Sequence, residues 1–405
     1  MRSSSKLPTV PSVLPVDPRL PELAELTDPE RAIHVLARSS PWPLESARVR
    51  YLEHDPGRFF LIHLQVTSGP DRHDVVISRV RDVRDVRDVR DVPVGDGGPG
   101  SAGGEKARDG TDGLRVAWYP VDLGLPLLAH PTRLAELLNL DPACAPEMLA
   151  WTPQHRAVLR IGEVVVKLYP TAAEAEASRD HLETVSRLLL SARLVHAEVP
   201  AGAVVQTAVD GEPLTRDEAL TEARAAARIA RQLHSATATA TAAGLRKHTP
   251  EAMLTVCEPV TRLTVFAQPE ITDRVQALVG RLRDSAPASE ELVLSHGDFT
   301  WGQLLRTAGG PLALLDTDTL CLAPAAFDIA SYAANLVSGR EEDLPLALRV
   351  LAEVVAGYGV APAGLQWWLS ASLLRRLDRP LRRLKRTWPG RTEAILAAAE
   401  SAAPR

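Results

Sequence analysis

The alternation of apolar and polar residues along the chain predicts a β-rich first part and a helical last part. Segments rich in β-branched, aromatic and other apolar residues occupy 48–66, 114–120 and 151–169, as expected for strands and hairpins. From Thr215 the sequence becomes Ala-rich with helical periodicity, and most of the chain beyond Pro250 follows the same pattern. Strands that precede helices in this way indicate an α+β fold.

The clearest hairpin signal lies around the dipeptide Gly162-Glu163. Two apolar runs, 157–161 and 164–168, flank this dipeptide, as in two strands joined by a tight turn. A helix is predicted next, over 171–195. Its first residue is a threonine, a good N-cap, and Glu174 stands three positions later, as in a capping box.

The order of these segments suggests three parts. Residues 1–150 are interpreted as an N-terminal cap or extension, residues 151–208 as a β-rich lobe and residues 209–405 as a helical lobe. An Arg-Asp-Val triplet repeat and a Gly-rich tract fill 81–113, and a period of three suits neither a helix face nor a strand face. This insertion is expected to be disordered, with a charged docking segment as the alternative. Residues 1 to about 30, interrupted by prolines, are expected to form an arm that becomes ordered only late.

Composition favours small-molecule chemistry. The 405 residues carry 46 basic and 51 acidic side chains, a formal net charge of −5, so no overall positive field favours nucleic acid. The three cysteines form no Cys-x-x-Cys pair, which argues against a disulfide scaffold and structural zinc. No apolar run approaches the roughly 18 residues of a membrane span, and no signal-peptide core is present. A cytoplasmic protein with neither a nucleic-acid nor a membrane partner is expected.

Acidic and amide side chains gather in one stretch of the helical part. His296, Asp298 and Gln303 fall within a predicted loop, and Asp316 and Asp318 follow a short apolar run. Carboxylate and amide oxygens are suitable ligands for Mg²⁺. Phosphoryl transfer also needs a carboxylate that orients the attacking hydroxyl. The pattern therefore indicates a site for Mg²⁺ and phosphate.

The spacing of this set, His296-Gly297-Asp298-x4-Gln303 followed by Asp316 and then by Asp328, resembles the motifs of the aminoglycoside phosphotransferase and choline kinase-like superfamily. That resemblance implies a bilobal protein kinase-like fold and a kinase that depends on ATP and Mg²⁺. It implies Asp298 as the catalytic base and His296 as a brace of the catalytic loop. Asp316 would be the principal Mg²⁺ ligand, and Asp328 would cap its helix and hold the loop.

Three positions depart from the family pattern. Gln303 stands where these enzymes usually have a metal-binding Asn, and it keeps the amide oxygen on a longer side chain. Gln at this place is also typical of the maltokinase-like branch, whose N-terminal extension resembles residues 1–150. Thr300 replaces a common His, and Asp318 stands where Gly is frequent, either as a second metal ligand or as an exposed side chain. A nucleotide-binding pseudokinase or regulatory protein is therefore the alternative to an active kinase.

The resemblance also implies the nucleotide-binding residues. Lys167 ends an apolar strand and would bind phosphate, with Glu183 as its helix partner and Glu176 as the second choice. The hinge that contacts adenine would use backbone groups of Gln206 and Ala208. No Gly-x-Gly-x-x-Gly motif precedes the lysine.

The acceptor is expected to be a hydroxyl of a small molecule, a sugar or an aminoglycoside-like compound. Near the C-terminus, the stretch 373–391 is strongly basic. It is either a solvated helix face or a surface that recognises an anionic or sugar-phosphate substrate. His234, at the end of a predicted helix, is interpreted as structural.

Overall fold

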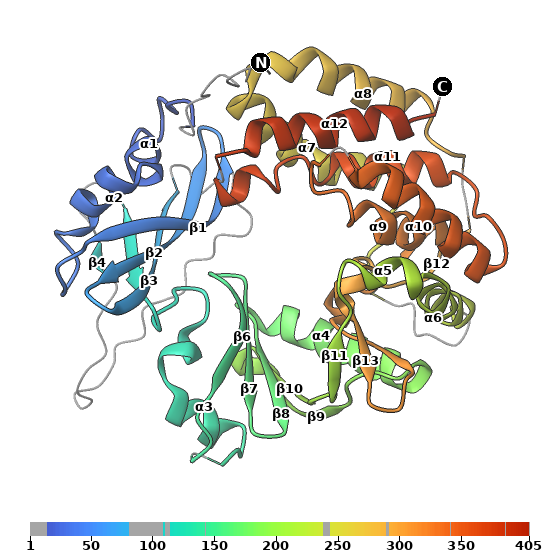
Figure 1. Ribbon diagram of the computed structural model, residues 1–405. Helices are drawn as coiled ribbons and strands as arrows, with labels where there is room; N and C mark the ends of the chain where they lie inside the picture. Colours follow the sequence, from blue (N-terminus) through green and yellow to red (C-terminus); the bar gives the residue numbers. More distant parts are fainter. Residues whose placement is uncertain are drawn as a thin grey trace, which may run out of the picture.

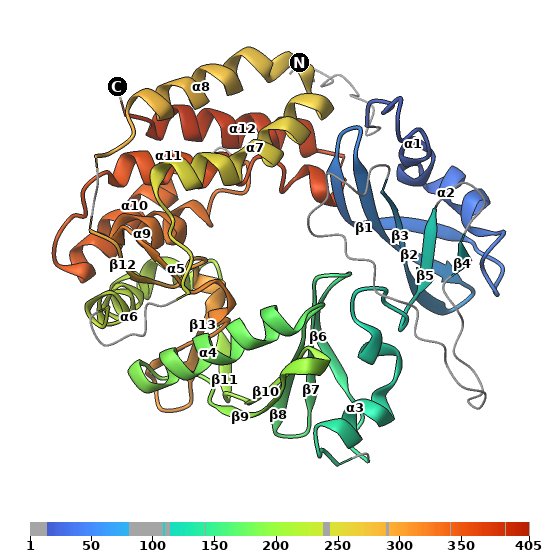
Figure 2. The ribbon, with the colours of Figure 1, turned by 180° about the vertical axis from the view of Figure 1, so that it is seen from behind.

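The computed structural model describes residues 14–80, 108–109, 114–141, 143–237, 244–288, 291–340, 342–384 and 386–404. Three bodies are arranged around a common centre: an N-terminal cap, a β-rich lobe and a helical lobe (Figures 1 and 2). The predicted α+β, bilobal fold with an N-terminal extension is confirmed. Most of the expected insertion at 81–113 lies outside the described residues.

The cap is a five-stranded antiparallel sheet covered by two short helices. Its strands are β1 (Ser46–Asp55), β2 (Phe59–Ser68), β3 (Asp71–Val80), β4 (Arg108–Asp109) and β5 (Arg115–Trp118), in the order β1-β2-β3-β5-β4. The two helices are α1 (Glu22–Thr27) and α2 (Pro29–Leu36). Alternate residues of β2, such as Phe60 and Ile62, share one apolar core with Leu23 and Leu26 of α1 and with residues of α2. The chain is therefore folded from Leu14 onward, earlier than the prolines suggest, because these leucines complete the cap core.

The β-rich lobe is a second antiparallel sheet. Its strands are β6 (Glu147–Thr152), β7 (Arg156–Ile161), β8 (Val164–Leu168), β9 (Leu194–Glu198) and β10 (Ala203–Thr207), in the order β6-β7-β8-β10-β9. The turn at Gly162, where φ is 57°, joins β7 and β8 as the sequence predicts. Leu125 and Leu134, from the segment that includes η1 (Pro126–Ala129) and α3 (Pro131–Leu137), pack with this sheet. The lobe thus begins before Leu125 and not at residue 151.

Helix α4 (Ala172–Leu188) connects β8 to β9. The Thr171 hydroxyl accepts a hydrogen bond from the Glu174 N–H at 3.2 Å, so the predicted N-cap is present. The helix ends at Leu188, short of the predicted residue 195. The physical reason is that Leu194 already belongs to β9, which pairs with β10.

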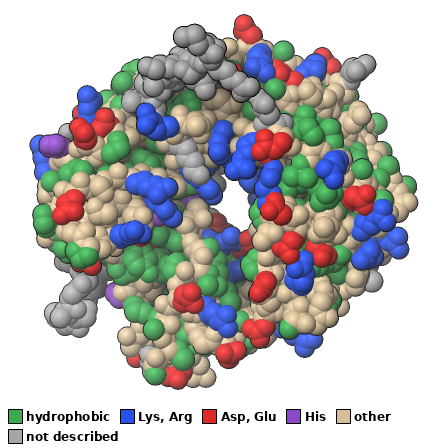
Figure 3. All heavy atoms as spheres, viewed as in Figure 1, with side chains coloured by type: hydrophobic (Ala, Val, Ile, Leu, Met, Phe, Trp, Pro, Cys, Tyr) green, Lys and Arg blue, Asp and Glu red, His purple; other side chains and the backbone are tan. Residues whose placement is uncertain are grey.

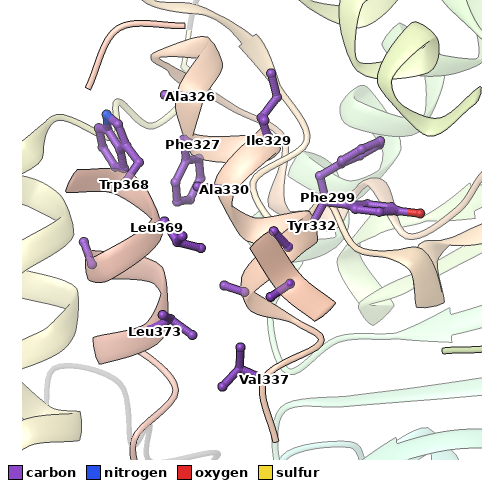
Figure 4. Packing of buried hydrophobic residues seen from close by; sticks show 14 of the residues in the cluster. Phe299, Ala326, Phe327, Ile329, Ala330, Tyr332, Val337, Trp368, Leu369 and Leu373 are labelled. Carbon is purple, nitrogen blue, oxygen red and sulfur yellow. The ribbon is translucent and has the colours of Figure 1, made fainter. Parts of the chain in front are cut away.

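The helical lobe carries eight described helices and two small sheets. Its helices are α5 (Glu218–Thr221), α6 (Ala223–Ser235), α7 (Pro250–Ala267), α8 (Thr272–Asp284), α9 (Ala325–Ala334), α10 (Asp343–Tyr358), α11 (Leu365–Leu374) and α12 (Trp388–Ala402). Its strands are β11 (Gly211–Pro213), β13 (Leu304–Thr307) and β14 (Leu312–Leu314) in one sheet, and β12 (Val293–Ser295) and β15 (Cys321–Ala323) in the other. Figure 4 shows α9 and α11 packed together, with the Phe327 and Trp368 rings 5.4 Å apart.

The cap contacts both lobes. Its apolar core continues into the helical lobe through Leu263 and Trp388. Its contact with the β-rich lobe is both polar and aromatic. Glu53 lies 2.9 Å from the His155 ring, Gln154 donates to the Ser78 hydroxyl at 3.3 Å, and the rings of His63 and Trp151 are 4.9 Å apart. The three bodies therefore close into a ring around the opening visible in Figure 3. Within the described residues, no helix is both long and apolar enough to cross a membrane.

Candidate active site

The loop that follows β12 is fixed to α9 by one buried carboxylate. Asp328 accepts hydrogen bonds from the backbone N–H groups of His296, at 2.7 Å, and Gly297, at 3.0 Å. His234 lies 3.2 Å from the same carboxylate and 2.9 Å from the Tyr358 hydroxyl. His234 thus links three elements of the lobe, in agreement with a structural role.

Asp328 is fully buried, yet it is positioned to remain ionised. Burial alone would raise its pKa, but the hydrogen bond and charge of His234 and the bond from His296 outweigh burial and hold the pKa of Asp328 below its usual value. The expectation that it caps its own helix is wrong, because α9 begins three residues earlier and has no side-chain cap. Its oxygens are used by the loop instead.

Two side chains of the loop attach it to its surroundings, and a third remains accessible. His296 is buried, and its Nε2 lies 2.9 Å from the Leu315 carbonyl oxygen, one residue before Asp316. Phe299 is buried against Tyr332 of α9 at 5.7 Å between rings (Figure 4). Between them, the Asp298 side chain is one-third exposed. The loop is thus anchored on both sides of an accessible carboxylate.

Asp316 and Asp318 face two cations from the β-rich lobe. Arg156 at the start of β7 donates both terminal nitrogens to Asp316, at 2.7 and 3.1 Å. Lys167 at the end of β8 donates to Asp316 at 3.0 Å and to Asp318 at 2.9 Å. Burial opposes ionisation of Asp316, but Lys167 and Arg156 outweigh it and keep its pKa well below the usual range. Acids of one lobe and cations of the other therefore meet at one point.

Asp318 is not a solvated side chain. Besides Lys167, it accepts hydrogen bonds from the Tyr169 hydroxyl at 2.9 Å and the Ser178 hydroxyl at 3.0 Å. Burial and the negative charge of Asp318 raise the pKa of Tyr169 well above its usual value, so the phenol stays protonated and remains a donor. The exposed interpretation of Asp318 is excluded by these contacts.

Glu183 does not pair with Lys167. It lies on an exposed side of α4 and pairs with Arg187 at 2.9 Å. The face of the helix that turns inward carries Ala175, Ser178 and Leu182, so Ser178 occupies the position toward Asp318. The expectation that Glu183 pairs with Lys167 is therefore wrong, because the rotation of the helix turns Glu183 away from the site. Glu176 also lies outside the site, where it pairs with Arg179.

Arg156 is a site residue that sequence reasoning does not single out. A signal was available in the strand pairing. Ala157, Leu159 and Ile161 point into the apolar core of the lobe, so Arg156 and Val158 share the other face. Val158 pairs directly with Lys167 across the ladder. The parity of β7 therefore places Arg156 on the same face as the lysine.

The backbone groups of Gln206 and Ala208, expected to contact adenine, are partly used by hydrogen bonds within the lobe. Gln206 lies in β10 between β8 and β9, and it pairs with Val165 and Leu194. The Ala208 N–H donates to the Glu163 carbonyl oxygen at 3.1 Å. The expected adenine contact through the Ala208 N–H is therefore not open, because the end of β10 still bonds to the β7–β8 turn.

The residues implied for Mg²⁺ include two converging carboxylates. Gln303 accepts the Leu315 N–H through its backbone oxygen at 2.8 Å, which places Gln303 beside the segment that leads into Asp316. Asp316 and Asp318 both contact the same Arg156 nitrogen. The described part of the chain contains no group of three His, Cys, Asp or Glu side chains arranged to hold a metal. Two carboxylates nevertheless fit Mg²⁺, which commonly takes one or two carboxylates, waters and substrate phosphates.

Gly297→Ala is expected to disrupt the loop that carries Asp298. Gly297 has φ of 85°, and a Cβ there would overlap the carbonyl oxygen of Thr319, whose hydroxyl bonds to the His296 oxygen. Gly310 has φ of 91° with open space around it, so Gly310→Ala carries the backbone strain without the clash. We expect the first variant to melt lower than the second and to lose activity. Equal melting temperatures and activities would contradict this role.

Comparison with known proteins agrees with this geometry. Residues 150–368, more than half of the chain, match the phosphotransferase enzyme family. The chain therefore belongs to this family of phosphotransferases.

Among solved structures, the chain is similar to the amicoumacin kinase hAmiN in complex with AMP-PNP, Ca²⁺ and Ami. The two are 15% identical, 67% of this chain and 92% of that chain are covered, and the TM-score is 0.52. This likeness agrees with the bilobal fold. No curated protein sequence matches the chain.

Two further structures have lower TM-scores. The aminoglycoside phosphotransferase APH(3'')-Id from Streptomyces rimosus, in complex with ADP and streptomycin, is 20% identical over 62% of this chain and 98% of that chain, with a TM-score of 0.48. A choline/ethanolamine kinase family protein from Mesorhizobium loti is 15% identical over 69% of this chain and 90% of that chain, with a TM-score of 0.49.

Proposed function

We propose that the chain transfers the γ-phosphoryl group of ATP, with Mg²⁺, to a hydroxyl group of a small molecule. The observation that carries this proposal is the meeting of Lys167 and Arg156 with Asp316 and Asp318. Phosphoryl transfer depends on cations for the phosphates and carboxylates for the metal at one place. The AMP-PNP in the amicoumacin kinase structure supports ATP as the donor.

In this proposal Asp298 orients the acceptor hydroxyl and takes its proton. A bond forms between the hydroxyl oxygen and the γ-phosphorus, the bond from that phosphorus to the bridging oxygen breaks, and ADP leaves. The one-third exposure of Asp298 gives the hydroxyl access. His296 and Asp328 act as positioning residues, because they fix the loop backbone and touch neither substrate.

Asp316, Asp318 and Gln303 are the residues that would hold Mg²⁺. The bound ion would neutralise charge on the phosphates. Arg156 and Lys167 already contact these carboxylates, so a nucleotide that arrives with its metal must share or displace those contacts. Both cations would then be free to donate to phosphate oxygens, for which a guanidinium is well suited.

Lys167→Met is expected to weaken ATP binding roughly tenfold or more, because it removes a charged donor to phosphate. Isothermal titration calorimetry with ATP and Mg²⁺ measures this change. The same substitution at Lys247, an exposed lysine of the helical lobe, is the matched control and should leave the affinity unchanged. Equal ATP affinities in the wild type and the Lys167 variant would contradict the assignment.

Transfer itself is tested by mass spectrometry of candidate acceptors after incubation with ATP and Mg²⁺. The panel comprises sugars, aminoglycosides and amino alcohols, and the expected result is the mass gain of one phosphate on a hydroxyl compound. Nucleotide binding without any transfer would contradict the proposal and would fit a nucleotide-binding regulatory protein instead.

A further inference from the structure

A buried arginine beside Asp298 has no hydrogen-bond partner in the described part of the chain. Arg376, just after α11, is 1% exposed, and each of its three guanidinium nitrogens is buried without a hydrogen-bond acceptor. Buried polar groups are nearly always hydrogen-bonded, and an unpaired buried charge is costlier than an unpaired neutral group. Three unpaired donors on one buried cation therefore require an explanation.

The nearest carboxylate is that of Asp298. It lies 4.0 Å from Arg376 and 3.5 Å from Arg375, so both contacts are at or beyond the outer limit of a hydrogen bond. Asp378, the acidic residue within the same segment, forms an ion pair with Arg382 at 2.7 Å. One loosely held carboxylate thus faces two guanidinium groups.

The local charge is positive beyond what Asp298 neutralises. Arg375 and Arg379 both add repulsion to Arg376, and together with burial they hold the pKa of Arg376 well below its usual value. Two guanidinium groups, those of Arg375 and Arg376, against the one carboxylate of Asp298 leave a net charge of one positive. A cationic acceptor would be repelled here, whereas an anion would relieve the repulsion.

We propose that Arg375 and Arg376 bind an anionic group, a carboxylate or a phosphate, of the same molecule whose hydroxyl is oriented by Asp298. This inference rests on the proposed function, because that function places the acceptor at Asp298. The cations for the nucleotide are separate, since Lys167 and Arg156 contact Asp316 and Asp318. The substrate class is therefore an acidic hydroxyl compound, a hydroxy acid or a sugar phosphate.

Anion binding is tested first without turnover, by calorimetric titration with inorganic phosphate in chloride buffer of constant ionic strength. We expect saturable binding to the wild type and affinity roughly tenfold or more weaker in Arg376→Met, from loss of a charge-assisted donor set. Lys167→Met should retain the phosphate affinity, which distinguishes this site from the nucleotide site. Equal affinity in the Arg376 variant, or no saturable binding to the wild type, would overturn the proposal.

The melting temperature separates ligand binding from a structural role. Replacing an unpaired buried charge by an apolar side chain is expected to leave Tm without phosphate unchanged or raised. A clear fall in Tm would mean that Arg376 serves the fold, for example through buried water, and the proposal would be wrong. Arg375→Gln, at a less buried position, gives a second measure of phosphate affinity in case the first variant does not fold.

The chemical class of the acceptor is tested with four compounds of one carbon skeleton: D-glucose, D-gluconate, D-glucose 6-phosphate and D-glucosamine. Each is titrated as a competitor of inorganic phosphate and offered as an acceptor with ATP. We expect D-gluconate and D-glucose 6-phosphate to displace inorganic phosphate, and the neutral and cationic compounds not to displace it. Whichever anion competes more strongly shows whether the site prefers a carboxylate or a phosphate. Displacement by glucosamine as strong as by the anions would refute anion selectivity. If the wild type does not bind ATP, the proposed function is refuted. The titration with inorganic phosphate would still test the anion site, because it does not depend on ATP.

Discussion

Asp298→Asn is expected to lower kcat for phosphoryl transfer by roughly 10²–10⁴-fold, the range typical of a lost general base. The amide keeps the size of the side chain but does not take a proton from the hydroxyl. ATP affinity should change little, because the nucleotide cations contact Asp316 and Asp318 instead. Single-turnover kinetics and calorimetry with ATP measure the two quantities.

Two controls sharpen this experiment. The Asp298 side chain is one-third exposed, so the variant should melt close to the wild type. Removal of its charge leaves Arg375 and Arg376 with less negative charge nearby, so inorganic phosphate should bind as tightly as before or more tightly. Wild-type activity in the Asn variant would show that another group accepts the proton.

Asp328→Ala is expected to lower the free energy of unfolding by about 3–5 kcal/mol, the cost of breaking a buried charge pair. The change leaves the N–H groups of His296 and Gly297 without their acceptor. The folded fraction should also have a lower kcat, because the loop that carries Asp298 loses its anchor. Urea unfolding, and activity measured at low temperature, check these two effects.

The dependence on pH follows from the same carboxylate. Because folding lowers the pKa of Asp328 below its usual value, its stabilising effect is complete above the usual carboxyl range. It is lost as the pH falls through the pKa of the folded state. The wild type should therefore lose more stability in acid than Asp328→Ala does, and parallel stability curves would contradict this explanation.

Asp343→Ala is the matched control for this variant. Asp343 is also fully buried, and it accepts the N–H groups of Ser338 and Arg340 at 2.7 and 2.9 Å. It lies at the start of α10, away from the catalytic loop. We expect a comparable loss of stability with kcat nearly unchanged in the folded protein. Equal loss of kcat in both variants would mean that stability alone explains the effect of Asp328.

Local features of the fold were predictable from sequence because they depend on neighbours in the chain. The β7–β8 hairpin requires only two apolar runs and a residue such as Gly162 that accepts positive φ. The start of α4 requires only Thr171 and its hydrogen bond to the Glu174 N–H. The motif from His296 to Asp328 was recognisable because its spacing is fixed by short loops and the three short strands β13, β14 and β15.

The missed features depend on how separate elements pack. Whether Glu183 or Ser178 faces the site is decided by the rotation of α4 on the sheet. Helical periodicity leaves this rotation open when polar residues occupy several faces. Arg156 reaches acids 160 positions away in the chain. Arg376 belongs to a basic segment that appears solvent-facing in sequence, yet the fold buries it. In each case packing between distant segments decides the role of the residue, and the local sequence pattern carries no information on that packing.

The two contacts of the cap differ in what it takes to separate them. Parting the cap from Leu263 and Trp388 exposes apolar surface to water, at about 25 cal/mol per Å². Parting the cap from the β-rich lobe exchanges the half-exposed Glu53–His155 contact for contacts with water at little net cost, and it also separates the rings of His63 and Trp151. The cap should therefore separate from the β-rich lobe more readily than from the helical lobe, because the helical lobe contributes Leu263, Leu381 and Trp388 to the apolar core of the cap.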